Sequence, residues 1–167
     1  MPQPEHLDPS AYAFDAPGAS VGVLLIHGLG GSAAETRPMG EYLAARGLSV
    51  RCPLLPGHGT TIEDLSRIHR QVWIDEVEAA LGDLQSRCEN VFVGGLSMGS
   101  LLTLWLGANH PDIAGLLPMT PLVKIQSPLA PLTLLGRYFI KSVPQGIAGE
   151  ETFADPEAID RIWTYDE

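Results

Sequence analysis

Basic residues are scarce in this sequence of 167 residues. Lys and Arg together number 10, against 20 Asp and Glu, which gives a formal net charge of −10. The few basic residues form no cluster along the chain. Nucleic acids and anionic membrane surfaces attract proteins through concentrated positive charge. The sequence therefore predicts neither of them as a partner.

Long apolar runs are missing and cysteines are few. No stretch of about 18 apolar residues is uninterrupted, so we expect neither a transmembrane helix nor a stable membrane anchor. The opening residues, MPQPEHLDPS, lack the basic end and apolar centre of a signal peptide. Cys52 and Cys88 lie far apart and form no C-x-x-C motif. We interpret them as reduced packing residues of a cytoplasmic protein.

Spacings that would hold a metal or a phosphate are also lacking. His, Cys, Asp and Glu show no metal-ligand spacing, and the glycine-rich stretch HGLGG (27–31) lacks the lysine of a P-loop. We expect no metal and no other cofactor.

The sequence does contain alternating strands and helices. Apolar runs ended by glycine or proline predict strands at residues 21–28, 48–55, 90–96 and 113–123, with a short one at 11–14. Helical spacing of apolar residues predicts helices at 35–47, 72–88 and 98–110. This alternation is typical of a parallel α/β sheet with crossover helices.

The domain limits follow from the same pattern. Residues 1–20, rich in Pro, Ala and Asp, are predicted to be a loose lead-in, and residues 21–123 are predicted to form the core. Residues 124–167 carry scattered prolines and glycines and no clear strand, so we interpret them as an excursion outside the sheet.

A strand runs into a helix through Gly95-Leu96-Ser97-Met98-Gly99. The pattern G-x-S-x-G at such a junction is the nucleophile elbow, which exposes a serine hydroxyl above the carboxyl edge of the sheet. Side chains at Gly95 and Gly99 would clash with the neighbouring strand and helix. Ser97 is therefore the candidate nucleophile, and the alternative is a structural turn with a solvated serine.

A second glycine-rich turn follows the first long strand. Acyl transfer needs two backbone N–H groups aimed at the developing oxyanion. One is expected from Met98, directly after the nucleophile, and the other from Leu29 in the loop that starts with His27 and Gly28. The alternative for this loop is a plain glycine turn.

The stretches LLIHGLGGSAAETRPMGEYLAARG, PLLPGHGTTIEDL and NVFVGGLSMGSLLTLWLGANHPDIAGLLPM resemble the α/β-hydrolase superfamily, specifically its small bacterial monoacylglycerol lipases and carboxylesterases. The resemblance implies a three-layer αβα core in which Ser97 is the nucleophile. It also implies that Leu29 and Met98 bind the oxyanion and line the acyl site. His27 would order the oxyanion loop, and His58 would shape the next loop.

The resemblance further implies that residues 124–167 start a helical cap. Ser100 departs from the group, which often has glycine there, and we expect little consequence because serine is small. The family's triad runs in the order Ser, Asp or Glu, His, yet the histidine that follows Ser97 is His110. It is predicted to lie roughly 20 Å from the elbow, at the helix end. We therefore interpret the chain as truncated within the cap before the last strands, with the triad Asp and His in a missing C-terminal part.

Two functions remain open at this point. The first is a serine hydrolase of small-molecule acyl esters, such as monoacylglycerols or short- to medium-chain esters, whose isolated 167 residues are nearly inactive. A thioesterase or an acyltransferase would use the same nucleophile and oxyanion hole. The second is a catalytically incomplete module that binds a partner or an acyl ligand, or that associates with a second copy or its own C-terminal half through an exposed apolar sheet edge.

We expect structural roles for four other residues, two tryptophans and two glutamates. Trp73 and Trp105 have apolar surroundings at helical spacing, which favours core packing over substrate contact. Glu35 and Glu63 are near loops that face the site, and we interpret them as helix-start and solvated surface residues.

Overall fold

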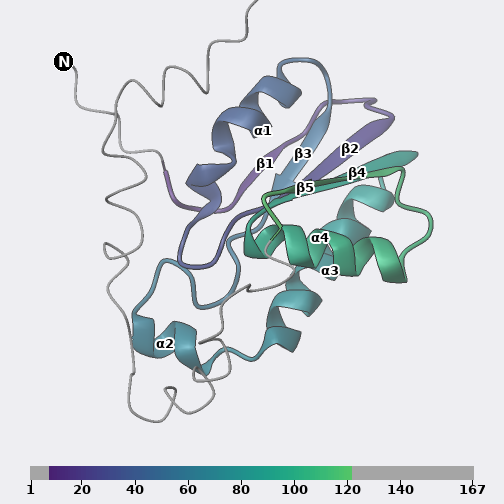
Figure 1. The fold of residues 1–167 in the computed structure, drawn as a ribbon. Helices are drawn as coiled ribbons and strands as arrows, with labels where there is room; N and C mark the ends of the chain where they lie inside the picture. The colour runs from purple at the N-terminus through teal and green to yellow at the C-terminus, as the bar shows by residue number, and fades with distance from the viewer. Residues whose placement is uncertain (1–7, 122–167) are drawn as a thin grey trace, which may run out of the picture. The chain divides into compact units, whose positions relative to one another are not determined.

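The structure is a computed structural model that describes residues 8–121. The elements along the chain, labelled in Figure 1, are β1 (Tyr12–Phe14), β2 (Val21–Ile26), the 3-10 helix η1 (Ala33–Glu35), α1 (Arg37–Ala44), β3 (Ser49–Cys52), α2 (Ile62–Arg67), α3 (Arg70–Gln85), β4 (Asn90–Leu96), α4 (Met98–Asn109) and β5 (Gly115–Met119). The cap expected at 124–167 lies outside the described residues, as does the beginning of the expected lead-in.

The strands form one sheet in the order β1-β3-β2-β4-β5. The short strand β1 pairs antiparallel with β3, and all the other pairs are parallel. Figure 1 shows α1 on one face of this sheet and α3 with α4 on the other. The predicted three-layer α/β core is confirmed, and the strand expected at residues 11–14 is present as β1.

Strand β2 shows why the sheet is covered on both faces. Leu24 and Ile26 pack in a core cluster with residues of α3 and α4, while Val23 and Leu25 pack in a second cluster on the α1 side. Successive side chains of a strand point to opposite faces, so an uninterrupted apolar run needs a helix layer above and below.

The register of the sheet brings the two expected site loops together. Strands β2 and β4 pair from Val21 with Asn90 to Ile26 with Gly95. Both strands run in the same direction, so their carboxyl ends meet at one edge. The loop after Ile26 and the turn after Leu96 therefore start side by side, although about 70 residues separate them in the sequence.

Some strand limits differ from those expected. Strand β3 ends at Cys52 instead of residue 55, because Pro53 has no N–H to donate to a neighbouring strand. Strand β5 ends at Met119, and the next residue, Thr120, has a φ of 53°, which breaks the extended backbone.

Helix α2 was not expected from the sequence. Its sequence signal is Thr61 followed three residues later by Asp64, and the Thr61 hydroxyl oxygen accepts the Asp64 N–H at 3.1 Å. A side-chain oxygen that accepts an N–H of the first turn stabilises the start of a helix. The helix places its Ile62 side chain, 62% exposed, at the surface.

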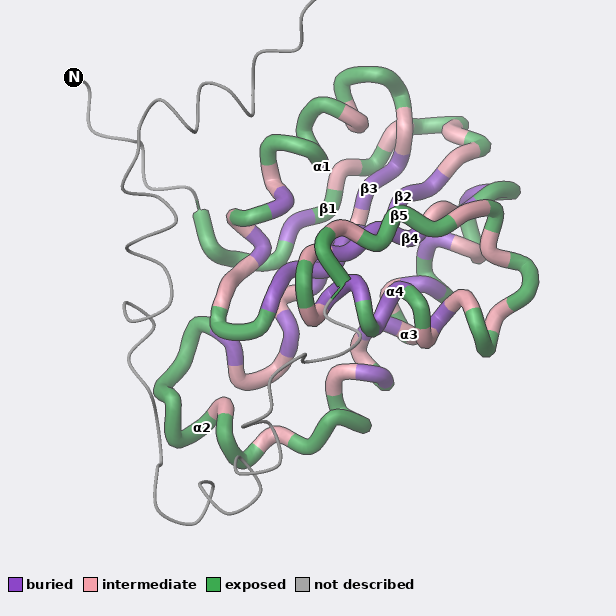
Figure 2. The backbone as a smooth tube through the Cα atoms, in the orientation of Figure 1, coloured by how far each residue is buried: buried purple, intermediate pink, exposed green. Residues whose placement is uncertain are grey.

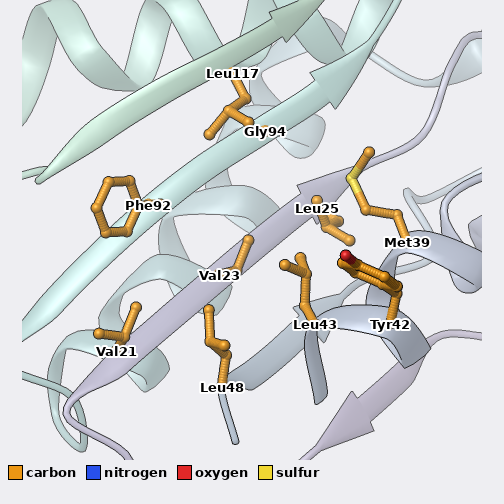
Figure 3. A pocket seen from close by; sticks show the side chains of 10 residues that line it. All are labelled: Val21, Val23, Leu25, Met39, Tyr42, Leu43, Leu48, Phe92, Gly94 and Leu117. Carbon is orange, nitrogen blue, oxygen red and sulfur yellow. The ribbon is translucent and has the colours of Figure 1, made fainter. Parts of the chain in front are cut away.

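Within residues 8–121, β5 is an edge strand whose Leu116 and Leu117 are exposed (Figure 2). The α1 side of the sheet carries an apolar groove of about 360 Å³, shown in Figure 3. Its lining comes from β2, β4, β5, α1 and the residue before β3: Val21, Val23, Leu25, Met39, Tyr42, Leu43, Leu48, Phe92, Gly94 and Leu117. The groove and the open edge meet at Leu117.

Candidate active site

Ser97 lies at the junction of β4 and α4 in a strained backbone conformation. Its φ is 53° and its ψ is −111°, outside the regions that residues with a side chain ordinarily occupy. The residue is exposed. The Ser97 N–H donates to the Met119 carbonyl at 2.9 Å, and the Ser97 carbonyl accepts the Ser100 N–H at 3.0 Å. The backbone on both sides holds the strain and leaves the hydroxyl at the surface.

The glycines around Ser97 are required by close backbone contacts. A Cβ on Gly95 would lie 2.2 Å from the Gly99 carbonyl oxygen. A Cβ on Gly99 would lie 2.3 Å from the carbonyl oxygen of Ile26 and 2.7 Å from that of His27. The first turn of α4 thus packs directly on the end of β2, with no room for a side chain between them.

The loop after β2 lies beside the serine. A Cβ on Gly28 would lie 3.6 Å from both the Ser97 Cβ and the Leu96 carbonyl oxygen. Gly28 is buried, whereas the Leu29 side chain is 55% exposed. The structure therefore places the backbone of the HGLGG loop against the elbow and directs its leucine side chain outward.

His27 is buried and holds this loop with both ring nitrogens. Its Nε2 accepts the Leu55 N–H at 3.0 Å, so this nitrogen carries no proton. Its Nδ1–H then donates to the Gly28 carbonyl at 2.9 Å. Burial lowers the pKa of His27, which favours the neutral ring that these two hydrogen bonds require.

The Gly28 carbonyl sets the direction of the Leu29 amide. It accepts hydrogen bonds from the His27 ring and from the Gly31 N–H, the latter at 3.3 Å. In a planar trans peptide the C=O and the following N–H point in opposite directions. Fixing the Gly28 oxygen therefore also fixes the Leu29 N–H, which points away from the His27 ring.

Met98 is the first residue of α4, and its side chain packs partly against the core cluster. The N–H groups of a first helical turn have no acceptor within the helix. They give the helix start a partial positive charge, which favours an anion. The Met98 amide is therefore available at the elbow.

The loop PGHG, residues 56–59, is linked to His27 through the neighbouring Leu55. His58 is buried, and its Nδ1 bonds the carbonyl oxygen of Leu55, whose N–H binds His27. The His27 and His58 rings meet edge to face at 4.7 Å. The Trp73 Nε1–H donates to the Pro56 carbonyl at 2.8 Å. The Trp73 ring packs against the core, as predicted, and also holds this loop.

Ser100 has more contacts than expected. Its side chain is fully buried, and its hydroxyl lies 2.6 Å from the Gly95 carbonyl oxygen and 2.5 Å from that of Met119. A serine hydroxyl has a single proton, so the two carbonyl oxygens share one donor. Serine fits the contact between helix and strand, and its hydroxyl in addition links α4 to the ends of β4 and β5.

Glu35 is the residue whose role the sequence analysis missed. We expected a helix-start or solvated surface residue, and Glu35 does lie in η1 just before α1. Its carboxylate, however, accepts the N–H of Gly28 at 2.9 Å. An acid seven positions after a glycine is no recognisable motif, so no sequence signal could have found this contact.

His110 follows α4 at its far end, and its Nε2 lies 3.2 Å from the Glu78 carboxylate. The predicted helix-end position is confirmed. Among the histidines of residues 8–121, none makes a hydrogen bond to Ser97. The same stretch contains no group of three or more His, Cys, Asp or Glu that could hold a metal ion.

Comparison with known proteins identifies the family. Residues 19–163 match the model of the family described as serine aminopeptidase, S33, a family of α/β-hydrolases. The chain belongs to this family. The predicted resemblance to α/β-hydrolases is thereby confirmed, and with it the class of serine hydrolases that contains esterases and lipases.

Two curated relatives are bacterial enzymes. A thermostable monoacylglycerol lipase from a Bacillus species is 44% identical over 123 residues, which cover 74% of this chain and 49% of the relative. A carboxylesterase from Bacillus subtilis is 35% identical over 115 residues, covering 68% of this chain and 46% of the relative. The chain spans about half the length of the curated relatives it matches.

Solved structures agree with this assignment. A structure of a metagenome-derived lipolytic enzyme is 32% identical, with a TM-score of 0.71, and covers 81% of this chain and 54% of that one. A monoglyceride lipase from Saccharomyces cerevisiae has a TM-score of 0.60 over 74% of this chain and 46% of that one, and at 19% identity it supports the fold alone.

In residues 8–121 no helix combines the length and apolarity needed to cross a membrane.

Proposed function

We propose that this chain carries the nucleophile and the oxyanion hole of a carboxylic ester hydrolase that acts on monoacylglycerols or on short- to medium-chain acyl esters. The observation that carries the proposal is the strained, exposed Ser97 next to the Gly28 backbone. The relatives named monoacylglycerol lipase and carboxylesterase support the ester class.

In the proposed reaction the Ser97 oxygen attacks the ester carbonyl carbon and its proton passes to a base. The N–H groups of Leu29 and Met98 hold the oxygen that becomes negative. When the carbonyl re-forms, the alcohol leaves with that proton and an acyl-serine remains. Water then attacks the acyl-serine and releases the acid. His27, Gly28, Gly95 and Gly99 support the two loops and take no part in proton transfer.

The base and its acidic partner are proposed to come from sequence outside these 167 residues. His27 is unsuited to the role because both of its ring nitrogens are engaged by backbone groups. His110 is turned toward Glu78. A serine without a base keeps a small part of the catalysis through the oxyanion hole. The proposal therefore includes very low turnover by the isolated chain.

The test follows acylation of Ser97. The chain is incubated with p-nitrophenyl butyrate, and nitrophenol release and the mass of the Ser97 peptide are measured for the chain and for Ser97→Ala. We expect slow release with butyryl accumulating on Ser97, because deacylation also lacks its base. Equal release by both proteins, with no acylated Ser97 peptide, contradicts the proposal.

The second candidate function is a catalytically incomplete binding module, favoured by β5, which is an edge strand among residues 8–121 and has exposed Leu116 and Leu117. Its proposed occupant is a strand from a C-terminal half, since the curated relatives are about twice as long as the matched region. Light scattering tests this candidate by measuring the mass of the chain and of Leu117→Lys, each alone and mixed with such a C-terminal half. A monomeric wild-type chain that captures no such half contradicts it, and concentration-dependent self-association would assign the edge to a second copy.

A further inference from the structure

We propose that Glu35 is a positioning residue that holds the loop His27–Gly31 in the shape needed to bind an oxyanion. The inference rests on the proposed function for the part that concerns catalysis. Glu35 touches neither the nucleophile nor, in this proposal, the substrate. It acts through the backbone of the glycines in the loop.

The Glu35 carboxylate spans both ends of the glycine-rich turn. Its Oε2 accepts the Gly28 N–H at 2.9 Å. Its Oε1 lies over the Cα of Gly31, since a Cβ there would be 2.0 Å from this oxygen. One carboxylate therefore contacts the turn at its first and its last glycine, and Gly31 has to be a glycine for that contact to exist.

Hydrogen bonds to residues nearby in the sequence keep the Glu35 backbone in place. The Glu35 N–H donates to the Ser32 carbonyl at 3.1 Å, and the Ser32 hydroxyl oxygen accepts the Ala34 N–H at 3.4 Å. The next residue, Thr36, is buried and bonds Tyr12 of β1 and Cys52 of β3 through its hydroxyl. The carboxylate is thus attached to the sheet through η1 rather than placed at the end of a free loop.

Two successive peptide units of the loop are fixed by different side chains. The peptide between His27 and Gly28 donates to Glu35, and the peptide between Gly28 and Leu29 accepts from the His27 ring. Glycine backbones have wide conformational freedom. Without Glu35, the amide of the buried Gly28 loses its acceptor, and the direction of the Leu29 N–H depends on the two contacts of the Gly28 carbonyl, with the His27 ring and with the Gly31 N–H.

The exposure of Glu35 limits the effect of its removal to the Gly28 contact. The residue is exposed, so its truncation leaves no cavity in the core. Glu41 on α1 is also exposed, and its removal changes the net charge equally. Glu41→Ala is therefore the matched control, and Glu35→Gln is the conservative variant, since its amide oxygen can still accept from Gly28.

The first experiment measures hydrogen exchange of the Gly28 and Leu29 amides by NMR in the 167-residue chain. We expect exchange at Gly28 to be about tenfold faster or more in Glu35→Ala, because exchange reports local opening. Glu35→Gln and Glu41→Ala should stay close to the wild type. Unchanged exchange in Glu35→Ala overturns the proposal.

The second experiment measures Ser97-dependent acylation by p-nitrophenyl butyrate in the same variants. We expect Glu35→Ala to lower the rate constant for acylation of Ser97 about tenfold, with the ester concentration that gives the half-maximal acylation rate changed less than about twofold, since a misdirected donor weakens the transition state more than substrate binding. Glu35→Gln should restore most of the rate. Faster Gly28 exchange without a loss of rate shows a loop contact with no role in positioning, and also overturns the proposal.

These readouts separate the two proposals. If Ser97→Ala releases nitrophenol as fast as the wild type, the ester hydrolase proposal fails. The claim that Glu35 positions a catalytic donor fails with it, although the exchange result still decides whether the carboxylate shapes the loop. If Ser97 acylation is present and only the Glu35 variants behave like the wild type, the Glu35 proposal fails alone.

Discussion

Ser97 donates its backbone N–H to the carbonyl oxygen of Met119 at 2.9 Å, so the turn that carries the candidate nucleophile is tied to the last residue of β5. The neighbouring pair Leu96 and Met119 is the last in the register of β4 and β5. The strained turn is therefore held by β5 on one side and by the backbone of β2 on the other. This arrangement leads to predictions about stability that do not depend on turnover.

Gly99→Ala should destabilise the fold strongly. The new Cβ would lie 2.3 Å from the Ile26 carbonyl oxygen, a backbone atom of the central strand that cannot move aside cheaply. Overpacking of this kind costs about 3 kcal/mol. Urea denaturation followed by circular dichroism measures the loss.

The matched control for this substitution is Gly82→Ala in α3. A Cβ at Gly82 meets nothing within 4 Å. Alanine there should raise the free energy of unfolding by about 1 kcal/mol, because alanine is the better helix former. Similar effects of the two substitutions would contradict the close packing of α4 on β2.

Stability should fall as the pH drops below about 6.5, and His27 should account for part of the fall. Burial lowers the pKa of His27 from its ordinary value of 6.5 in the folded chain. Between the folded and the unfolded pKa the unfolded state binds more protons, so unfolding is favoured by acid. The His27 contribution is complete above the unfolded pKa and is lost as the pH falls toward the folded one.

Urea midpoints at pH 7.5 and pH 5.5 test this prediction. His27→Gln should be less stable at the higher pH and should show a weaker pH dependence than the wild type. His69→Gln, at an exposed position before α3, should keep the wild-type dependence. An unchanged pH dependence in His27→Gln would mean that the ring is not held neutral by the fold.

Ser100→Ala should cost about 1–2 kcal/mol of unfolding free energy. The substitution removes the hydroxyl that lies between the buried carbonyl oxygen of Gly95 and the partly buried one of Met119, and leaves both groups with fewer donors. Ser86→Ala is the control, since the Ser86 hydroxyl bonds the Asp83 carbonyl at an exposed site. We expect that change to stay within about 0.5 kcal/mol. Equal effects at both positions would contradict the link between α4 and β5.

Trp73→Phe should make the PGHG loop more mobile without creating a large cavity in the core. Phenylalanine keeps most of the ring packing but loses the Nε1–H that donates to Pro56 at 2.8 Å. We expect a loss of about 1 kcal/mol and faster proteolytic cleavage in residues 53–61. Trp105→Phe serves as the control, because Trp105 packs against the same cluster and its ring lies beside His110 at the end of α4. Unchanged cleavage in Trp73→Phe would contradict the role of the hydrogen bond.

The strands and helices could be predicted where a local signal exists. The run Val21–Ile26 is apolar at every position except its glycine, which indicates a strand covered on both faces, and the limits of β4 agree with those expected. The end of β3 was placed too late because Leu54 and Leu55 continue the apolar run. Leu55 is buried there as a loop residue whose N–H binds His27, and the run alone does not distinguish that loop from a strand.

The sequence by itself determined the family, the alternation of strands and helices, and the candidate nucleophile, because G-x-S-x-G and HGLGG are local patterns with local backbone consequences. Only the tertiary structure decided which side chains hold those backbones. Glu35 reaches Gly28, and Ser100 reaches Met119, because register and packing bring together residues whose spacing in the chain follows no rule. Such contacts depend on the three-dimensional path of the chain between the two partners, which no short motif encodes.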